Sequence, residues 1–143
     1  MATATGTIEL ASSAPDVWRA ATDFGRFPEW LAIHRKWVGD HPVGPVVGES
    51  CQQEVVLLGP PATITWTVAT VVPDTALELT GRGPSGIRAR FSCSVASVGA
   101  ITELTLELEF TGGPLTGPID VMIEKSAKSQ LEASLEKFRA MVS

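Results

Sequence analysis

The most informative segment of the chain is SAPDVWRAATDFGRFPEWL, residues 13–31. Ser13 and Asp16 have the spacing of a helix cap, because the Ser hydroxyl can accept a backbone N–H and the carboxylate favours the positive end of a helix. Apolar residues follow at helical spacing, and we expect Gly25 to end this first helix. Residues 26–31 then predict a second, short helix that is rich in aromatic side chains.

Strand-like runs surround these two helices. One precedes them at residues 6–11, and the others follow at 34–38, 49–58, 63–72, 76–80, 87–98 and 102–110. The last run alternates most regularly, with leucine and phenylalanine opposite glutamate and threonine, which is typical of an antiparallel sheet with one buried face. Residues 97–100 predict a hairpin turn between the last two strands.

An amphipathic helix closes the chain at about residues 118–142. Pro118 suits its first turn, and apolar residues mark one face at Ile119, Met122, Ala127, Leu131, Leu135, Phe138 and Val142. The order of elements predicts an α+β fold: a seven-stranded antiparallel sheet wrapped around the long C-terminal helix, with two short helices after the first strand. Such a shape tends to leave an apolar hollow.

The composition predicts one globular domain spanning residues 1–143, with 44% hydrophobic and 19% charged residues. A net charge of −5 and a pI near 5.0 argue against nucleic acid as a partner. The sequence has neither a secretory signal nor an apolar run of the ~18 residues that span a bilayer, so we expect a soluble, cytoplasmic protein. Cys51 and Cys93 are expected to be reduced thiols.

Three tryptophans are candidates to line a ligand pocket: Trp30, Trp37 and Trp66. Each offers a large apolar surface and one N–H donor, although each can equally fill the core. His34 is the acid–base candidate, because its ordinary pKa near neutrality suits proton transfer. The alternative is a partly exposed histidine bonded to backbone. We expect His41 to be solvated.

Other catalytic motifs find little support. No His or Cys pair has the close spacing of a zinc site, so we expect no metal and no cofactor. No G-x-S-x-G motif is present. Residues 81–86 match G-x-G-x-x-G, but a strand-like run follows them where a dinucleotide fold requires a helix, so the segment is interpreted as a turn.

Several motifs resemble those of one superfamily. The segment from Val17-Trp18 to Trp30-Leu31 is similar to the opening motif of the polyketide cyclase/dehydrase branch of the START/Bet v 1-like (SRPBCC) superfamily. EWLAIHRKW at 29–37 and GGPLTGPI at 112–119 resemble an actinobacterial subgroup named as toxins of type II toxin–antitoxin pairs. The resemblance covers nearly the whole chain and implies a helix-grip fold with an apolar cavity between sheet and helix.

Three functions follow from this resemblance: binding of a lipid-like or polyketide-like molecule, polyketide cyclisation with His34 as acid–base, and toxicity with an antitoxin protein as partner. The chain has no tyrosine and no asparagine, and its inward-facing positions are nearly all apolar, which favours binding over catalysis. The residues expected to line the cavity are Trp30, His34, Trp37, Trp66, Phe91, Leu106 and Met122.

Overall fold

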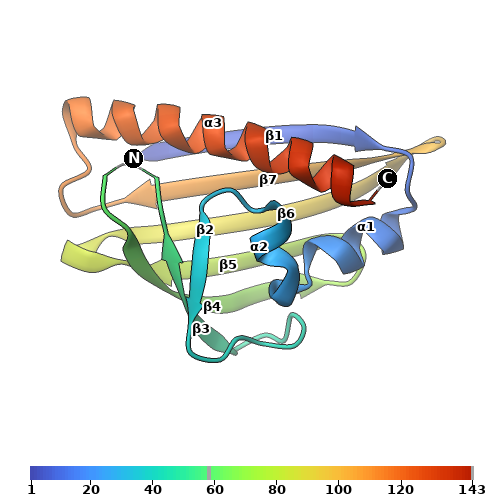
Figure 1. Ribbon diagram of the computed structural model, residues 1–143, viewed down its shortest axis with the longest axis horizontal. Helices are drawn as coiled ribbons and strands as arrows, with labels where there is room; N and C mark the ends of the chain where they lie inside the picture. The colour runs from blue at the N-terminus through green and yellow to red at the C-terminus, as the bar shows by residue number, and fades with distance from the viewer. Residues whose placement is uncertain (58, 143) are drawn as a thin grey trace.

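A computed structural model describes residues 1–57 and 59–142 of the chain (Figure 1). Its strands are β1 (Ala2–Leu10), β2 (His34–Val38), β3 (Ser50–Val55), β4 (Ala62–Val72), β5 (Ala76–Arg82), β6 (Arg88–Val98) and β7 (Ile101–Thr111). Its α-helices are α1 (Ala14–Ala21), α2 (Phe27–Trp30) and α3 (Gly117–Val142), and its 3-10 turns are η1 (Phe24–Arg26) and η2 (Pro84–Gly86).

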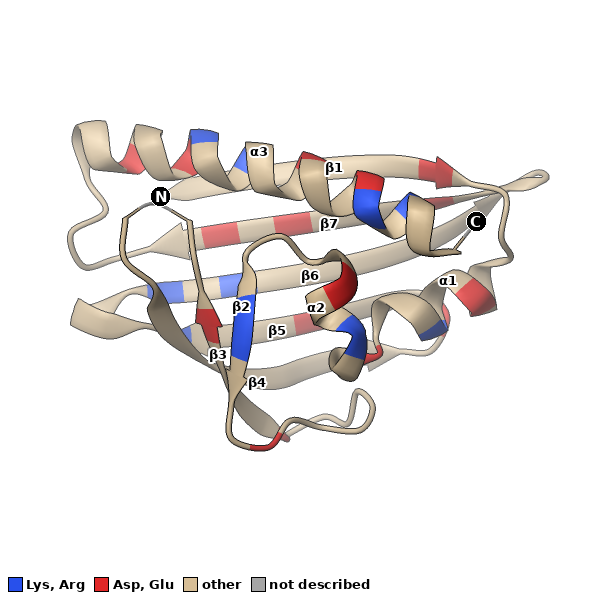
Figure 2. Ribbon diagram, in the orientation of Figure 1, with Lys and Arg blue, Asp and Glu red and all other residues tan. Residues whose placement is uncertain are grey.

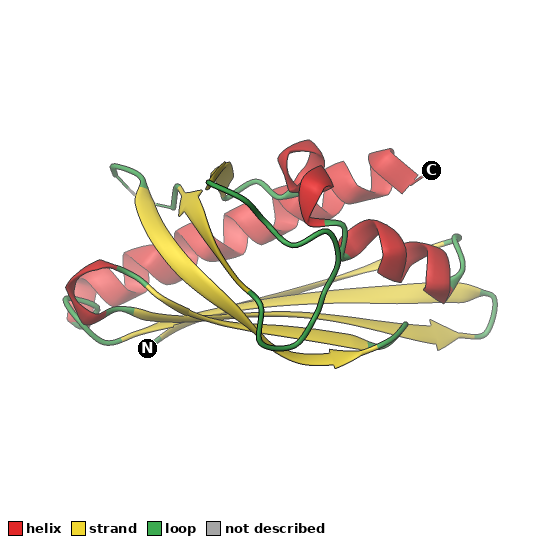
Figure 3. Cartoon of the chain, turned by 90° about the horizontal axis from the view of Figure 1, so that it is seen from below, coloured by secondary structure: helices red, strands yellow, loops and turns green. Residues whose placement is uncertain are grey.

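The strands form one antiparallel sheet in the order β1-β7-β6-β5-β4-β3-β2. The sheet curls, so that β2 and β3 rise beside the helices, and all three α-helices lie on one side of it (Figure 3). The seven-stranded sheet that holds a long C-terminal helix is therefore confirmed. None of the described helices is long and apolar enough to cross a bilayer.

Alternation along the strands decides which face is buried. Leu104, Leu106 and Leu108 of β7 are 0% exposed, whereas the intervening residues face solvent in part. The hairpin between β6 and β7 turns through Gly99, whose φ of +63° lies in the left-handed region. The predicted pattern of these two strands is confirmed, and their inner faces supply the floor of the core.

α3 packs closely on β1 because Gly6 has no side chain. A β-carbon at Gly6 would lie 2.9 Å from Cδ1 of Leu135. The buried face of the helix comprises Ala127, Leu131, Ser134, Leu135 and Phe138. Ile119 and Met122 were expected on this face, but they are 46% and 52% exposed. The buried stripe therefore begins a turn later, because the first turns of α3 extend beyond the core.

Polar contacts also tie α3 to β1. The Asp120 carboxylate lies 2.9 Å from the N-terminal amine, and Glu124 accepts a bond from the amide of Thr3 at 3.0 Å. Lys128 donates to the carbonyl of Thr5 at 2.9 Å. The helix is thus held along the edge strand.

The first helix begins as predicted but ends early. Ser13 accepts the amide of Asp16 at 3.4 Å, as expected of the cap. Gly25, however, does not end α1, which stops at Ala21. The backbone becomes extended at Asp23, whose carboxylate accepts the amide of Gly25 at 3.1 Å and caps the separate turn η1.

Two strand boundaries also differ from expectation. β1 begins at Ala2 instead of residue 6, because its whole length pairs with β7, from Ala2 opposite Phe110 to Leu10 opposite Thr102. β3 ends at Val55, short of the predicted residue 58, which lies outside the described residues. Local patterning cannot show where a neighbouring strand stops offering partners.

Candidate ligand-binding site

A cluster of aromatic rings forms where α2 meets β2. Phe27 lies at its centre, with ring centroids 5.6 Å from Trp30, 6.2 Å from His34 and 5.5 Å from Trp37. The single turn of α2 brings Phe27 and Trp30 onto the core, and both are almost fully buried. Trp30 also meets the ring of Phe138 at 5.1 Å, so the cluster joins α2 to α3.

A chain of hydrogen bonds runs from the centre of the sheet to this cluster. The indole Nε1 of Trp66 donates to Oε1 of Gln53 at 2.9 Å. Nε2 of Gln53 lies 2.7 Å from Nδ1 of His34. Trp66 and Gln53 are only 3% and 2% exposed and His34 is half-buried, so the three side chains form a polar path from the apolar interior to the aromatic cluster.

This path determines which nitrogen of His34 carries the proton. Because the indole N–H of Trp66 can only donate, the amide atom of Gln53 that faces it is the oxygen. The amide nitrogen of Gln53 therefore donates to Nδ1 of His34, which must be unprotonated. The neutral imidazole consequently carries its hydrogen on Nε2.

Two buried donors remain without partners among the described residues: Nε2 of His34 and Nε1 of Trp30. Buried polar atoms are nearly always hydrogen-bonded, and an unpaired one costs free energy. Burial lowers the pKa of His34, and the nearby His41 lowers it further, so the neutral ring is favoured. The site therefore offers hydrogen-bond donors in otherwise apolar surroundings.

An apolar cavity of about 150 Å³ opens between the sheet and α3, beyond the aromatic cluster. Its walls come from β3, β4, β7, α3 and the loops between them. The lining residues are Val55, Leu57, Pro60, Ala62, Ile64, Pro84, Ile87, Phe110, Leu115 and Ile123. A space of this size holds one ring or a short alkyl chain.

The seven residues expected to line the cavity occupy three kinds of place. Trp30, Trp66, Phe91 and Leu106 are buried in the core, while His34 and Trp37 are half-buried in or beside the aromatic cluster. Met122 is exposed on α3, and its neighbour Ile123 lines the cavity instead. None of the seven is among the residues lining this cavity, and their contact with a ligand stays a prediction.

Two other side chains differ from expectation or were missed. His41 is half-buried instead of solvated, because its ring stands 5.3 Å from Trp37 and its Nδ1 meets the Pro42 carbonyl at 2.9 Å. The sequence does not mark Gln53 as a site residue, because the apolar run after it leaves the register of its strand open. The signal in the sequence is a Gln in the strand that precedes the one with the central Trp66, because a buried indole N–H needs a hydrogen-bond acceptor.

The two cysteines are free, buried, and face the core. Burial raises the pKa of Cys51 to about 11, assisted by the charge of Glu49, and raises the pKa of Cys93 to about 12. Thiols with such values are protonated at neutral pH, so they behave as small apolar side chains. Among residues 1–57 and 59–142, no group of three or more His, Cys, Asp or Glu side chains gathers as a metal site.

Curated relatives share this chain's length. Proteins named Toxin Rv0910 and Toxin MT0934, from two strains of Mycobacterium tuberculosis, are each 27% identical over 138 residues, which is 96% of both chains.

Solved structures share its fold. An aromatase/cyclase, Zhui from Streptomyces sp. R1128, has a TM-score of 0.78 at 15% identity and covers 98% of this chain and 92% of its own. A START superfamily protein from Mycobacterium smegmatis has a TM-score of 0.76 at 19% identity, over 98% and 96% of the two chains. At these identities the likeness concerns the fold alone. Residues 1–143 match the family described as "Polyketide cyclase / dehydrase and lipid transport", and the chain belongs to that family.

Proposed function

We propose that the protein binds an apolar small molecule, lipid-like or polyketide-like, between the sheet and α3. The observation that carries the proposal is the cavity of about 150 Å³, whose ten lining residues are all apolar. Apolar surface left open inside a core lowers stability, because its lining atoms lose packing partners. A ligand that fills the space restores those contacts and gains about 25 cal/mol for each Å² of apolar area buried.

The size and polarity of the interior restrict the ligand. About 150 Å³ accommodates one ring or a short chain, so a larger molecule must displace lining side chains or leave a part outside. The unpaired N–H groups of His34 and Trp30 lie in the aromatic cluster, outside the cavity lining, so they favour an oxygen acceptor only in a ligand that reaches from the cavity to the cluster. A mainly apolar molecule that extends beyond the cavity and carries one carbonyl, carboxylate or hydroxyl group meets both requirements.

The hydrogen-bond path argues against His34 as a general base. In the tautomer that Gln53 selects, the Nδ1 lone pair is occupied and Nε2 carries a hydrogen, so neither nitrogen can accept a substrate proton. The ring can donate a hydrogen bond to a carbonyl oxygen, which suits orientation of a ligand. We therefore place binding ahead of the alternative, a cyclase or aromatase that uses His34 as acid–base.

The toxin alternative rests on relatives named as toxins that are 27% identical to this chain. If the name applies here, a protein antitoxin would be a partner. An antitoxin-like neighbouring gene, or co-purification with its product, would favour this function over binding alone.

The proposal is tested by native mass spectrometry of the purified protein, followed by titration with alkyl and aromatic probes of increasing size. We expect probe binding to be saturable, quench tryptophan fluorescence and raise Tm. Ile123→Trp fills the cavity and should weaken binding at least about tenfold, or about 1.4 kcal/mol. Met122→Trp is the matched control, because the Met122 side chain is exposed next to Ile123 on α3. This variant should bind the probes as the parent does. Equal binding by both variants would place the ligand elsewhere.

Trp66→Ala and His34→Ala extend this test. The first removes a large buried ring outside the cavity lining, so weaker binding with the sheet still folded would extend the site to Trp66. The second separates the carrier from the enzyme: a carrier loses at most a modest part of its affinity, whereas a cyclase that depends on His34 loses roughly 10²–10⁴-fold in rate.

A further inference from the structure

The outer face of the sheet, opposite the helices, carries a polar groove that the ligand cavity does not explain. Figure 3 shows that none of the described helices covers this face. An open groove of about 670 Å³ lies over β4, β5, β6 and β7. Its polar side chains are Thr65, Thr67, Thr80, Arg82, Arg88, Arg90, Glu109 and Thr111.

The sheet register arranges these side chains in rows across the strands. One row runs Gln52, Thr65, Arg82, Arg88 and Thr111, each directly opposite the next. The row beside it runs Ser50, Thr67, Thr80, Arg90 and Glu109. The first row holds no acidic residue and comprises two arginines and three uncharged polar residues.

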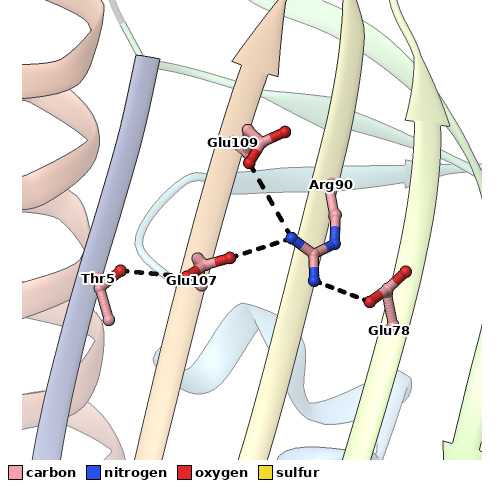
Figure 4. A network of polar contacts seen from close by, with 5 residues as sticks. All are labelled: Thr5, Glu78, Arg90, Glu107 and Glu109. Atoms are coloured by element: carbon pink, nitrogen blue, oxygen red, sulfur yellow. Dashed lines mark hydrogen bonds and ion pairs between the residues drawn. The ribbon is translucent and has the colours of Figure 1, made fainter. Parts of the chain in front are cut away.

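Arg90 is neutralised by its neighbours. Its guanidinium lies 2.9 Å from Glu78, 3.2 Å from Glu107 and 4.0 Å from Glu109, and Thr5 donates to Glu107 at 3.4 Å (Figure 4). These carboxylates also raise the pKa of Arg90, chiefly through its hydrogen bond with Glu78. Glu78, Glu107 and Glu109 are thus committed to one arginine.

Arg82 and Arg88 have no such partner. Neither side chain makes an ion pair or hydrogen bond with the rest of the described residues, although Figure 2 shows acidic residues on β7 beside the basic ones on β6. Directly opposite residues of an antiparallel pair have β-carbons roughly 5 Å apart, and like charges there repel each other. Arg82 and Arg88 are therefore an unneutralised pair of cations, although the chain as a whole carries a net charge of −5.

We propose that this row is a binding site for a phosphate oxyanion, held by Arg82 and Arg88 and flanked by the hydroxyls of Thr65 and Thr111. Guanidinium groups bind phosphate through paired, charge-assisted hydrogen bonds, and two of them side by side match its several oxygens. The bound dianion removes the repulsion between the arginines. The site lies on the face opposite the apolar cavity and is independent of the proposed apolar ligand.

Close backbone contacts between two loops fix the end of the sheet that carries this row. A β-carbon at Gly113 would lie 2.6 Å from the carbonyl oxygen of Ser85, and one at Gly112 would lie 2.8 Å from that of Gly86. The turn between Arg82 and Arg88 is therefore in close contact with the loop that follows Thr111. The backbone that carries the two arginines therefore needs little reorganisation when they bind an anion.

Calorimetric titration of the full-length protein with sodium phosphate, at low and constant ionic strength against sodium chloride, tests the site. We expect saturable binding with a Kd of about 1 mM or tighter. Arg82→Gln and Arg88→Gln should each weaken it about tenfold, and the double variant should abolish it. Arg19→Gln makes the same change of charge on α1, away from the groove, and should bind as the parent does.

Vesicles distinguish the source of the phosphate. If the parent binds both free phosphate and phosphatidylcholine vesicles that contain phosphatidic acid, and the double variant binds neither, the ligand is a lipid headgroup. Binding of free phosphate alone identifies a soluble ligand, and both results support the site. The site would be overturned if binding did not saturate by about 20 mM phosphate, or if the double variant bound phosphate as the parent does. It would also be overturned if the protein bound polyglutamate but did not bind phosphate. Because apolar probes enter the other face, their binding in the double variant checks the two proposals separately.

Discussion

The indole ring of Trp66 lies directly on the bare backbone of Gly81. A β-carbon at position 81 would stand 2.7 Å from Cε3 of the indole and 2.7 Å from Cγ2 of Ile64. The two residues are direct partners in the β4–β5 ladder, so the absence of a side chain on β5 gives the large ring of β4 its place. That place in turn puts Nε1 of Trp66 within reach of Gln53.

Gly81→Ala is therefore expected to destabilise the protein by about 1–3 kcal/mol through overpacking. Chemical denaturation measures the change. Gly44→Ala is the matched control, because a β-carbon there meets nothing within 4 Å, and it should change stability little. Equal stability of both variants would mean that the indole does not lie on Gly81.

Gln53→Glu should raise the pKa of His34 and place a hydrogen on its Nδ1. A carboxylate at position 53 accepts hydrogen bonds from both Trp66 and Nδ1 of His34, so it favours the imidazolium. We expect the pKa of His34 to lie below its ordinary value of 6.5 in the parent and to rise in the variant. NMR titration of the ring measures both, and a fall or no change in the variant would contradict the assigned tautomer.

The protein should lose stability as pH falls below about 6.5. Burial lowers the pKa of His34 in the folded state, so the unfolded chain binds more protons between the lowered value and the ordinary 6.5. Stability is retained above that window and is lost through it. The fall in Tm between pH 7.5 and pH 5.5 should be smaller in His34→Gln than in the parent, because the variant has no titrating group at position 34. An equal fall in both proteins would assign the effect to other groups.

Leu131→Asp should cost about 4 kcal/mol or more, because it places an unpaired charge in the core. Leu131 is only 1% exposed on the face of α3 that packs on the sheet. Ser129→Asp adds the same charge to an exposed position of the same helix and should be nearly neutral. Circular dichroism during thermal unfolding compares them, and similar melting curves would show that the buried face is misassigned.

Both cysteines should resist thiol reagents in the folded protein. With pKa values raised to about 11 and about 12, Cys51 and Cys93 are thiolates in roughly one molecule in a thousand or fewer at pH 8. Reaction with Ellman's reagent should be slow in buffer and fast in guanidinium chloride. Rapid labelling of the native protein would indicate that the core around β3 or β6 opens readily.

Periodicity was sufficient to predict most of the fold. The alternation in β6 and β7 and the stripe from Ala127 to Phe138 each reflect a single buried face, and such local patterns survive in the folded chain. Element boundaries were less predictable. Gly25 is predicted to end α1, yet the helix ends earlier, because the Asp23 side chain bonds the amide of Gly25 and begins a separate 3-10 turn.

The site depended much more on tertiary structure. The sequence by itself determined the sheet, its buried face, the aromatic segment and the absence of tyrosine and asparagine, because these depend on composition and on spacing along the chain. Only the tertiary structure decided that Gln53 joins Trp66 to His34, that Ile123 faces the cavity while Met122 does not, and that Arg82 stands opposite Arg88. These pairings come from strand register and helix rotation, which long-range packing sets and no local pattern records.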